Sequence, residues 1–183
     1  MPTPDPLADR LLDLLRLVND WLKFAETKNV GIVGLASGGL TLLVAATGFL
    51  RAEGIPLAAG FVLTAAGALL ALSLLVGVWS FMPASGAPQW LRSRIGAPNP
   101  SDNLLYFGHA AKYSPHDLVE TIARRYERQS DPVIHALHTD LAAQLVINAR
   151  ITLQKLWLFR WAVILFAAGV LMAAAGMLVA ILR

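Results

Sequence analysis

Three long apolar stretches alternate with polar segments along the chain. They cover residues 30–50, 55–82 and 161–182, and none of them contains Asp, Glu, Lys, Arg or His. Each is long enough to cross the hydrocarbon core of a bilayer as a helix. The pattern therefore predicts an all-α integral membrane protein with three transmembrane helices, an N-terminal amphipathic helix and a small helical cytoplasmic segment.

The apolar pattern divides the chain into four segments. We expect an N-terminal amphipathic cytoplasmic helix (1–29), a transmembrane helical hairpin (30–82), a cytoplasmic helical segment (83–156) and a third transmembrane helix (157–183). Asp5 is the expected N-cap of the first helix, with Pro6 at its first position. One apolar face follows at helical spacing: Leu7, Leu11, Leu14, Leu15, Val18, Leu22 and Ala25. This face either packs on the protein's own cytoplasmic part or lies on lipid, and the acidic residues of the helix favour packing.

The segment between the second and third spans begins as an irregular linker. Residues 83–100 are rich in Pro, Gly, Ser and Ala and carry Trp90, Arg92 and Arg94. Ser114, Pro115 and Asp117 then form a capping-box pattern that predicts a helix start. That helix presents the apolar residues Leu118, Val119, Ile122 and Tyr126, and it ends before another helix near Ser130, Asp131 and Pro132.

The last cytoplasmic helix leads toward the third span. Helical spacing continues through Ile134, Leu137, Leu141, Leu145 and Asn148. Two arrangements fit this pattern: one helix that runs unbroken into the bilayer, or a helical anchor with a break near Lys155. An unbroken helix is able to transmit motion from the cytoplasmic segment to the membrane.

Lys and Arg are distributed unevenly about the spans. They concentrate before residue 30 and between residues 83 and 160, whereas the other side has only Arg51 and Arg183. The positive-inside rule therefore predicts a cytoplasmic N-terminus, a cytoplasmic large loop and a C-terminus outside. Aromatic residues mark the cytoplasmic ends of the second and third spans: Trp79, Phe81, Trp157, Phe159 and Trp161.

Small residues recur within the spans at spacings that allow close helix packing. They are Gly34 and Gly38 in the first span, Gly67 and Ala71 in the second, and Gly169, Ala173, Gly176 and Ala180 in the third. They serve either packing within one subunit or the assembly of a homo-oligomer. The spans lack the ionisable residue that marks a proton relay, which argues against a pump or coupled transporter.

Enzyme chemistry has little support in the sequence. The chain has no cysteine, and it shows no Walker loop, dinucleotide fingerprint or Gly-x-Ser-x-Gly elbow. His135 and His138 are three residues apart, but polar surface is the simpler interpretation and we expect no metal site. A net charge of +3 without a basic cluster also argues against nucleic acid as a partner. We therefore expect no catalytic residues and no cofactor.

The segment SDNLLYFGHAAKYS, residues 101–114, combines aromatic, amide and cationic side chains without an amphipathic pattern. Such side chains suit stacking on a base and contact with a phosphate. The candidate ligand-binding residues are Asn103, Tyr106, Phe107 and Lys112, together with Arg124 and Arg125 of the next helix. The alternative is that Leu104, Tyr106 and Phe107 only fill the small cytoplasmic core.

Three motifs resemble the transmembrane effectors of Pycsar antiphage systems: NDWLKFAETKNVGIVGLASG, NLLYFGHAAKYS and DLAAQLVINARITLQKLWLF. The resemblance implies a bacterial inner-membrane effector with the bilayer as its target. A partner nucleotidyl cyclase that senses phage would make cyclic CMP or cyclic UMP, and the effector would then impair membrane integrity.

The resemblance leaves the sensor open. The chain has no strand-rich stretch for a cyclic-nucleotide-binding β-roll, so either the helical segment reads the signal or another protein does. The alternative function is a non-toxic membrane scaffold that recruits a cytoplasmic partner.

Overall fold

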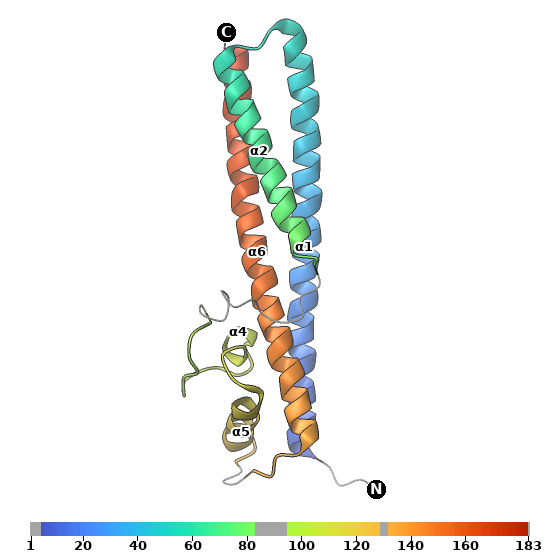
Figure 1. Cartoon of the computed structure of the whole chain (residues 1–183), viewed down its shortest axis with the longest axis vertical. Coiled ribbons are helices and arrows are strands. Elements are labelled where there is room, and N and C mark those ends of the chain that lie inside the picture. Colours follow the sequence, from blue (N-terminus) through green and yellow to red (C-terminus); the bar gives the residue numbers. More distant parts are fainter. Residues whose placement is uncertain (1–4, 83–94, 129–131, 183) are drawn as a thin grey trace. The chain divides into compact units, whose positions relative to one another are not determined.

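The computed structural model of the chain describes residues 5–82, 95–128 and 132–182. All regular structure in this part is helical: α1 (Pro6–Glu53), α2 (Leu57–Trp79), α4 (Phe107–Ala110), α5 (Pro115–Tyr126) and α6 (Ala136–Ile181) (Figure 1). Within it, α1, α2 and α6 are long and apolar enough to cross a membrane. The expected all-α fold with three membrane-spanning helices is confirmed. Trp90, Arg92, Arg94, Ser130 and Asp131 lie outside the described residues.

The chain divides into two compact units. The first, here called the polar unit, comprises residues 1–25 and 83–155. The second, the apolar unit, comprises residues 26–82 and 156–183. Each unit is described by itself below.

The start of α1 has the expected cap. The Asp5 Oδ1 atom accepts a hydrogen bond from the Ala8 backbone N–H at 3.1 Å, and the Asp5 carbonyl accepts one from Asp9 N–H at 3.0 Å. The predicted apolar face is largely buried in the polar unit, through Leu7, Leu11, Leu14, Val18 and Ala25. The apolar face of this part of α1 therefore packs on protein, which favours the first of the two interpretations.

The capping box of α5 also forms as expected. The Ser114 Oγ atom accepts from the Asp117 N–H at 3.2 Å and donates to Asp117 Oδ2 at 2.6 Å, with Pro115 as the first helical residue. The buried face of α5 consists of Leu118, Val119, Ile122 and Ala123. Tyr126, which we expected on this face, is only partly buried.

Helix α6 is continuous from Ala136 to Ile181 and has no break near Lys155. Its 46 residues correspond to a length of about 69 Å. Two details differ from the sequence pattern. Ile134 precedes the helix, and Leu137 is exposed, because the buried face of the first turns runs through His138, Ala142 and Leu145 instead.

The apolar unit is a three-helix bundle in which α1, α2 and α6 lie side by side (Figure 1). Helix α2 runs antiparallel to its neighbours, since Gly77 of α2 faces Val33 of α1, whereas Gly67 faces Leu43. The core of the bundle is formed by Leu43, Leu63, Ala66 and Leu70, with Phe166, Met172, Ala173 and Met177 of α6 packed against it.

The small residues of α6 and α1 are used differently. A Cβ added to Gly169 would lie 2.9 Å from Leu70 Cγ, and one added to Gly176 would lie 2.7 Å from Leu63 Cδ2. These glycines let α6 approach α2 within one subunit. Gly34 and Gly38 are exposed, and an added Cβ would have nothing within 4 Å.

One side-chain hydrogen bond joins two helices inside the apolar unit. The buried Ser73 Oγ of α2 donates to the Ala162 carbonyl of α6 at 2.8 Å. Bonds of this kind satisfy polar groups where no water is present, and they add to the packing of the helices.

Candidate ligand site of the polar unit

The buried carboxylate of Asp102 organises the segment before α5. It accepts hydrogen bonds from the Lys112 ammonium at 2.6 Å and from the Asn99 N–H at 2.8 Å, and His109 Nε2 lies 3.8 Å away. Burial alone would raise the pKa of Asp102, but the hydrogen bonds from Lys112 and Asn99 outweigh it and lower the pKa below its ordinary value. The carboxylate is therefore ionised at neutral pH.

Arg125 of α5 and Tyr113, just before α5, both donate hydrogen bonds to backbone carbonyls of the same segment. The Arg125 guanidinium donates to the backbone carbonyls of Asp102 and Pro100. The Tyr113 hydroxyl donates to the Asn99 carbonyl at 3.1 Å. Burial and the nearby Asp102 raise the pKa of Tyr113, so the phenol stays protonated and remains a donor.

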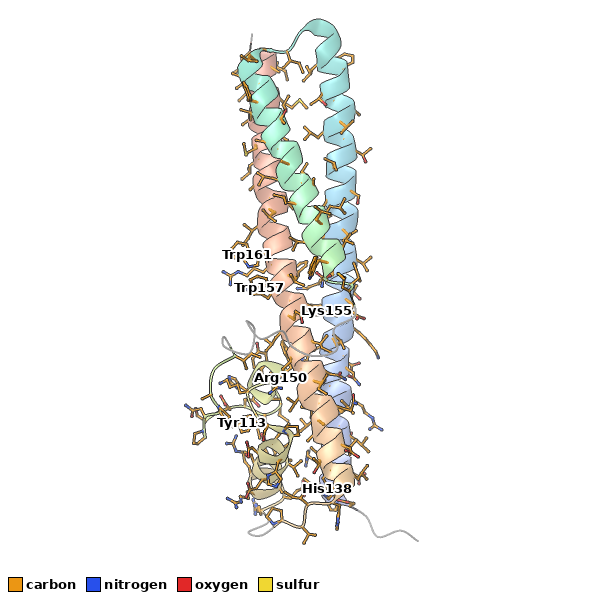
Figure 2. The ribbon with its side chains drawn as sticks, in the orientation of Figure 1. Tyr113, His138, Arg150, Lys155, Trp157 and Trp161 are labelled. Carbon is orange, nitrogen blue, oxygen red and sulfur yellow. The ribbon has the colours of Figure 1, made fainter. Side chains whose placement is uncertain are left out.

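Arg150 of α6 ties this segment to the long helix. Its Nε donates to the Ala111 carbonyl at 2.9 Å, and its Nη2 donates to the Tyr113 carbonyl at 3.0 Å (Figure 2). Because α6 is one unbroken helix, this fork attaches the loop directly to the element that forms the third span.

Further contacts join α1 to the rest of the polar unit. The His138 Nε2 lies 2.8 Å from Asp5 Oδ2, and Asn148 Nδ2 donates to Asn19 Oδ1 at 2.8 Å. His138 Nδ1 accepts from the His135 N–H at 3.2 Å, which leaves Nε2 as the nitrogen that donates to Asp5. The Ala8 N–H and His138 lower the pKa of Asp5. Among the described residues, no group of three or more metal-ligating side chains is present.

Aromatic rings from α1 and α4 form a second cluster. The Trp21 ring lies 5.3 Å from that of Phe107, and Phe107 lies 4.6 Å from Tyr106. Phe107 is only 3% exposed, so its ring belongs to the core, whereas Tyr106 is 43% exposed. Gly108 is required here, because a Cβ at this position would collide with the Tyr106 ring.

A cavity of about 440 Å³ opens beside α5. Its lining residues are Pro98, Asn99, Pro100, Tyr113, Glu120, Thr121, Arg124 and Arg125. The Arg124 guanidinium, with a side chain 60% exposed, pairs with the Glu120 carboxylate at 2.6 Å. A cavity of this size is in the range of small-molecule sites, roughly 300–1,000 Å³.

The structure separates the candidate residues into three groups. Arg124 and Arg125 line the cavity, Tyr106 and Phe107 belong to the aromatic cluster, and Lys112 is engaged by Asp102. The exposed Asn103 caps its own turn, because its Oδ1 accepts from the Leu105 N–H at 3.0 Å.

Sequence reasoning assigned no role to two residues of this region. Glu120 could have been recognised from its position four residues before Arg124. The role of Arg150 had no local signal, since its partners are 37 and 39 residues away along the chain.

The comparisons with known proteins bear on this geometry. The model of the family described as the Pycsar effector protein domain matches residues 10–182. The chain belongs to the Pycsar effector family. The match spans both the polar and the apolar unit, and no curated protein and no solved structure matches the chain significantly.

Family membership fixes the biological setting. Pycsar effectors act in bacterial antiviral defence, within a cyclic-nucleotide signalling system and at a membrane. The chain is therefore a bacterial membrane protein of an effector family, and that family is not a known enzyme family.

Proposed function

We propose that this chain is an inner-membrane effector that is triggered by a cyclic pyrimidine mononucleotide, cyclic CMP or cyclic UMP, and then impairs membrane integrity. The match of the Pycsar effector family to residues 10–182 carries the proposal. In this scheme a partner nucleotidyl cyclase supplies the nucleotide, and the N-terminus and the polar unit face the cytoplasm, where the nucleotide is made.

The polar unit supplies the ligand contacts in this proposal. A cyclic mononucleotide carries one negative charge, which suits Arg124 and Arg125 at the cavity, and its base suits an exposed ring such as Tyr106. Phe107 supports the same segment from the core, and Lys112 supports it through its bond to Asp102. Asn103 caps its own turn in this segment. Helix α6, whose Arg150 holds the carbonyl of Ala111 in this segment, supplies a continuous path toward the bilayer.

A response in the membrane also requires two states. A ligand shifts an equilibrium only if it binds one state more tightly than the other. We propose that the states differ in the association of subunits through the exposed small residues of α1, including Gly34 and Gly38.

The direct test follows membrane potential in cells that express the chain, with and without cyclic CMP or cyclic UMP. We expect depolarisation only when chain and nucleotide are both present. Arg124→Ala removes one charge-assisted contact, which is worth about 1.5–3 kcal/mol. The nucleotide concentration needed for depolarisation should therefore rise by roughly tenfold or more in this variant. The parallel variant Tyr106→Ala tests the aromatic cluster.

The controls are insertion and abundance of each variant in the membrane fraction. If the membrane potential does not change with the wild-type chain at saturating nucleotide, the proposal that a cyclic pyrimidine mononucleotide triggers this chain is refuted. A wild-type response that persists unaltered in both variants would place the sensor in another protein.

A further inference from the structure

The cavity beside α5 has a net positive wall. It is lined by Arg124 and Arg125 and by a single acidic residue, Glu120, and its other lining residues are uncharged. The low-dielectric protein walls of such a cavity focus the field of these charges on an occupant. The wall therefore favours a small anion over a neutral or cationic ligand.

The two arginines are held in different ways. The acceptors of Arg125 are the neutral backbone carbonyls of Asp102 and Pro100, so these contacts position the guanidinium without cancelling its charge. A guanidinium has further N–H donors beyond these bonds, in a planar fork that matches a phosphate. Arg125 therefore contributes a fixed positive charge to the wall of the cavity.

Arg124, in contrast, is held by a carboxylate. Glu120 lies one helical turn before it, and the pair meets at 2.6 Å with both side chains partly exposed to solvent. Exposed ion pairs at this spacing are weak, because water screens them and two flexible side chains must be ordered. An incoming anion can therefore replace Glu120 on Arg124 at little cost.

We propose that the cavity is the binding site for a soluble monoanionic phosphodiester, and that Glu120 occupies Arg124 until the phosphodiester displaces it. This inference rests on the proposed function, since it locates the trigger nucleotide within the polar unit. Arg124 and Arg125 contact the phosphodiester, and Glu120 sets the threshold by competing with it. Tyr106 and Phe107 do not line this cavity, so the charge-assisted contacts to the phosphodiester come from the two arginines.

The test is isothermal titration of the purified full-length chain in phosphatidylcholine nanodiscs, which exclude anionic headgroups. The probes are cyclic CMP and cyclic UMP. Glu120→Gln removes the competing charge but keeps the side-chain size, and we expect binding about threefold to tenfold tighter. Arg124→Gln should weaken binding by roughly tenfold or more, and Tyr106→Ala, outside the cavity lining, should weaken it less.

Asp140→Asn is the matched control for charge. It also removes one carboxylate from an exposed position of the polar unit, outside the cavity lining, and should bind as the wild type does. A gain in affinity in Glu120→Gln cannot arise from misfolding. This variant therefore tests the competition by Glu120 even if another variant is poorly folded.

The outcomes separate this inference from the proposed function. Wild-type affinity in Glu120→Gln, or an equal gain in Asp140→Asn, would overturn the competition by Glu120. Normal affinity in Arg124→Gln with weakened binding in Tyr106→Ala would move the site to the aromatic cluster and leave the proposed function intact. If the wild-type chain binds neither nucleotide, direct sensing by this chain fails, and this inference fails with it.

Discussion

A single buried carboxylate determines much of the local structure of the polar unit. Asp102 ties together the Asn99 turn and Lys112, while its own carbonyl is held by Arg125 of α5. Loss of the carboxylate would leave the Lys112 ammonium and the Asn99 N–H without their charge-assisted hydrogen bonds. The loop that forms one wall of the cavity therefore depends on the charge of one residue.

This dependence predicts a loss of stability in acid. Because the folded pKa of Asp102 is below its ordinary value of 3.8, its contribution is complete above that pH and is lost as pH falls through the lower folded pKa. We expect the hydrogen-exchange protection of residues 99–113, corrected for intrinsic rates, to be level between about pH 5 and 7 and to fall below about pH 4.

Asp102→Asn supplies the comparison. It should lower the protection of this segment at neutral pH by about 1–3 kcal/mol and remove most of its acid dependence. The cap residue Asp5 also has a lowered pKa, so protection at the start of α1 should keep its own acid dependence in the variant. An Asn variant with the acid profile of the wild type would show that another group controls the loop.

Local and distant interactions differed in how far the sequence revealed them. The caps at Asp5 and Ser114 could be predicted, because a capping side chain bonds to a backbone group within a few residues. The roles of Asp102 and Arg150 could not, since Lys112 is ten residues from Asp102 and the carbonyls that Arg150 binds are 37 and 39 residues away. The candidate Lys112 was recognised as a cation, but the sequence did not reveal that a buried carboxylate holds it.

Among the helices, the two sets of glycines have opposite environments. Gly169 and Gly176 of α6 face α2, whereas a Cβ added to Gly31, Gly34, Gly38 or Gly48 of α1 would have nothing within 4 Å. The exposed positions repeat three and four residues apart, and they form what we call the α1 small face: Gly31, Gly34, Gly38, Thr41, Ala45 and Gly48. A face of this kind lets a second helix approach closely in a bilayer.

The two sets therefore predict different defects. Gly176→Leu should destabilise the subunit by about 1–3 kcal/mol, because its Cβ alone would lie 2.7 Å from Leu63 Cδ2. Gly34→Leu and Gly38→Leu should leave the subunit stable and reduce its association. Thermal unfolding in detergent measures the first effect. Disulfide crosslinking through Thr41→Cys measures the second, since the chain has no native cysteine.

Val44→Leu is the control for added bulk, because Val44 is exposed on α1 outside the small face. It should change neither stability nor crosslinking. Full crosslinking in both glycine variants would exclude the α1 small face as the contact between subunits.

The helices also show where sequence patterns leave a choice. The apolar stretches identified all three spans, because a bilayer demands length and apolarity that little else requires. Whether α6 breaks near Lys155 depended on packing that the pattern does not contain, and the structure shows that it continues. The spacing of the glycines likewise predicted close packing but could not identify the partner helix.

For the whole molecule, the distribution of Lys and Arg predicts one orientation in the membrane. Reporter fusions after Met1 and within residues 85–100 should have cytoplasmic activity, and a fusion after Arg183 should have periplasmic activity. A fusion after Gly54, in the short connection between α1 and α2, provides a second periplasmic control. Cytoplasmic activity at Arg183 would remove one span from this topology.

The internal use of Gly169 and Gly176 also restricts symmetry. A face that binds its own copy closes a two-fold pair and leaves no surface for a third subunit, whereas a ring needs two different, complementary faces. Gly169 and Gly176 of α6, which could have contributed to a second face, are turned toward α2. Assembly through the α1 small face alone therefore stops at a pair, and a ring around a central pore would have to recruit another exposed face of the bundle, such as the one on α6 that carries Ala167, Ala174 and Ala175.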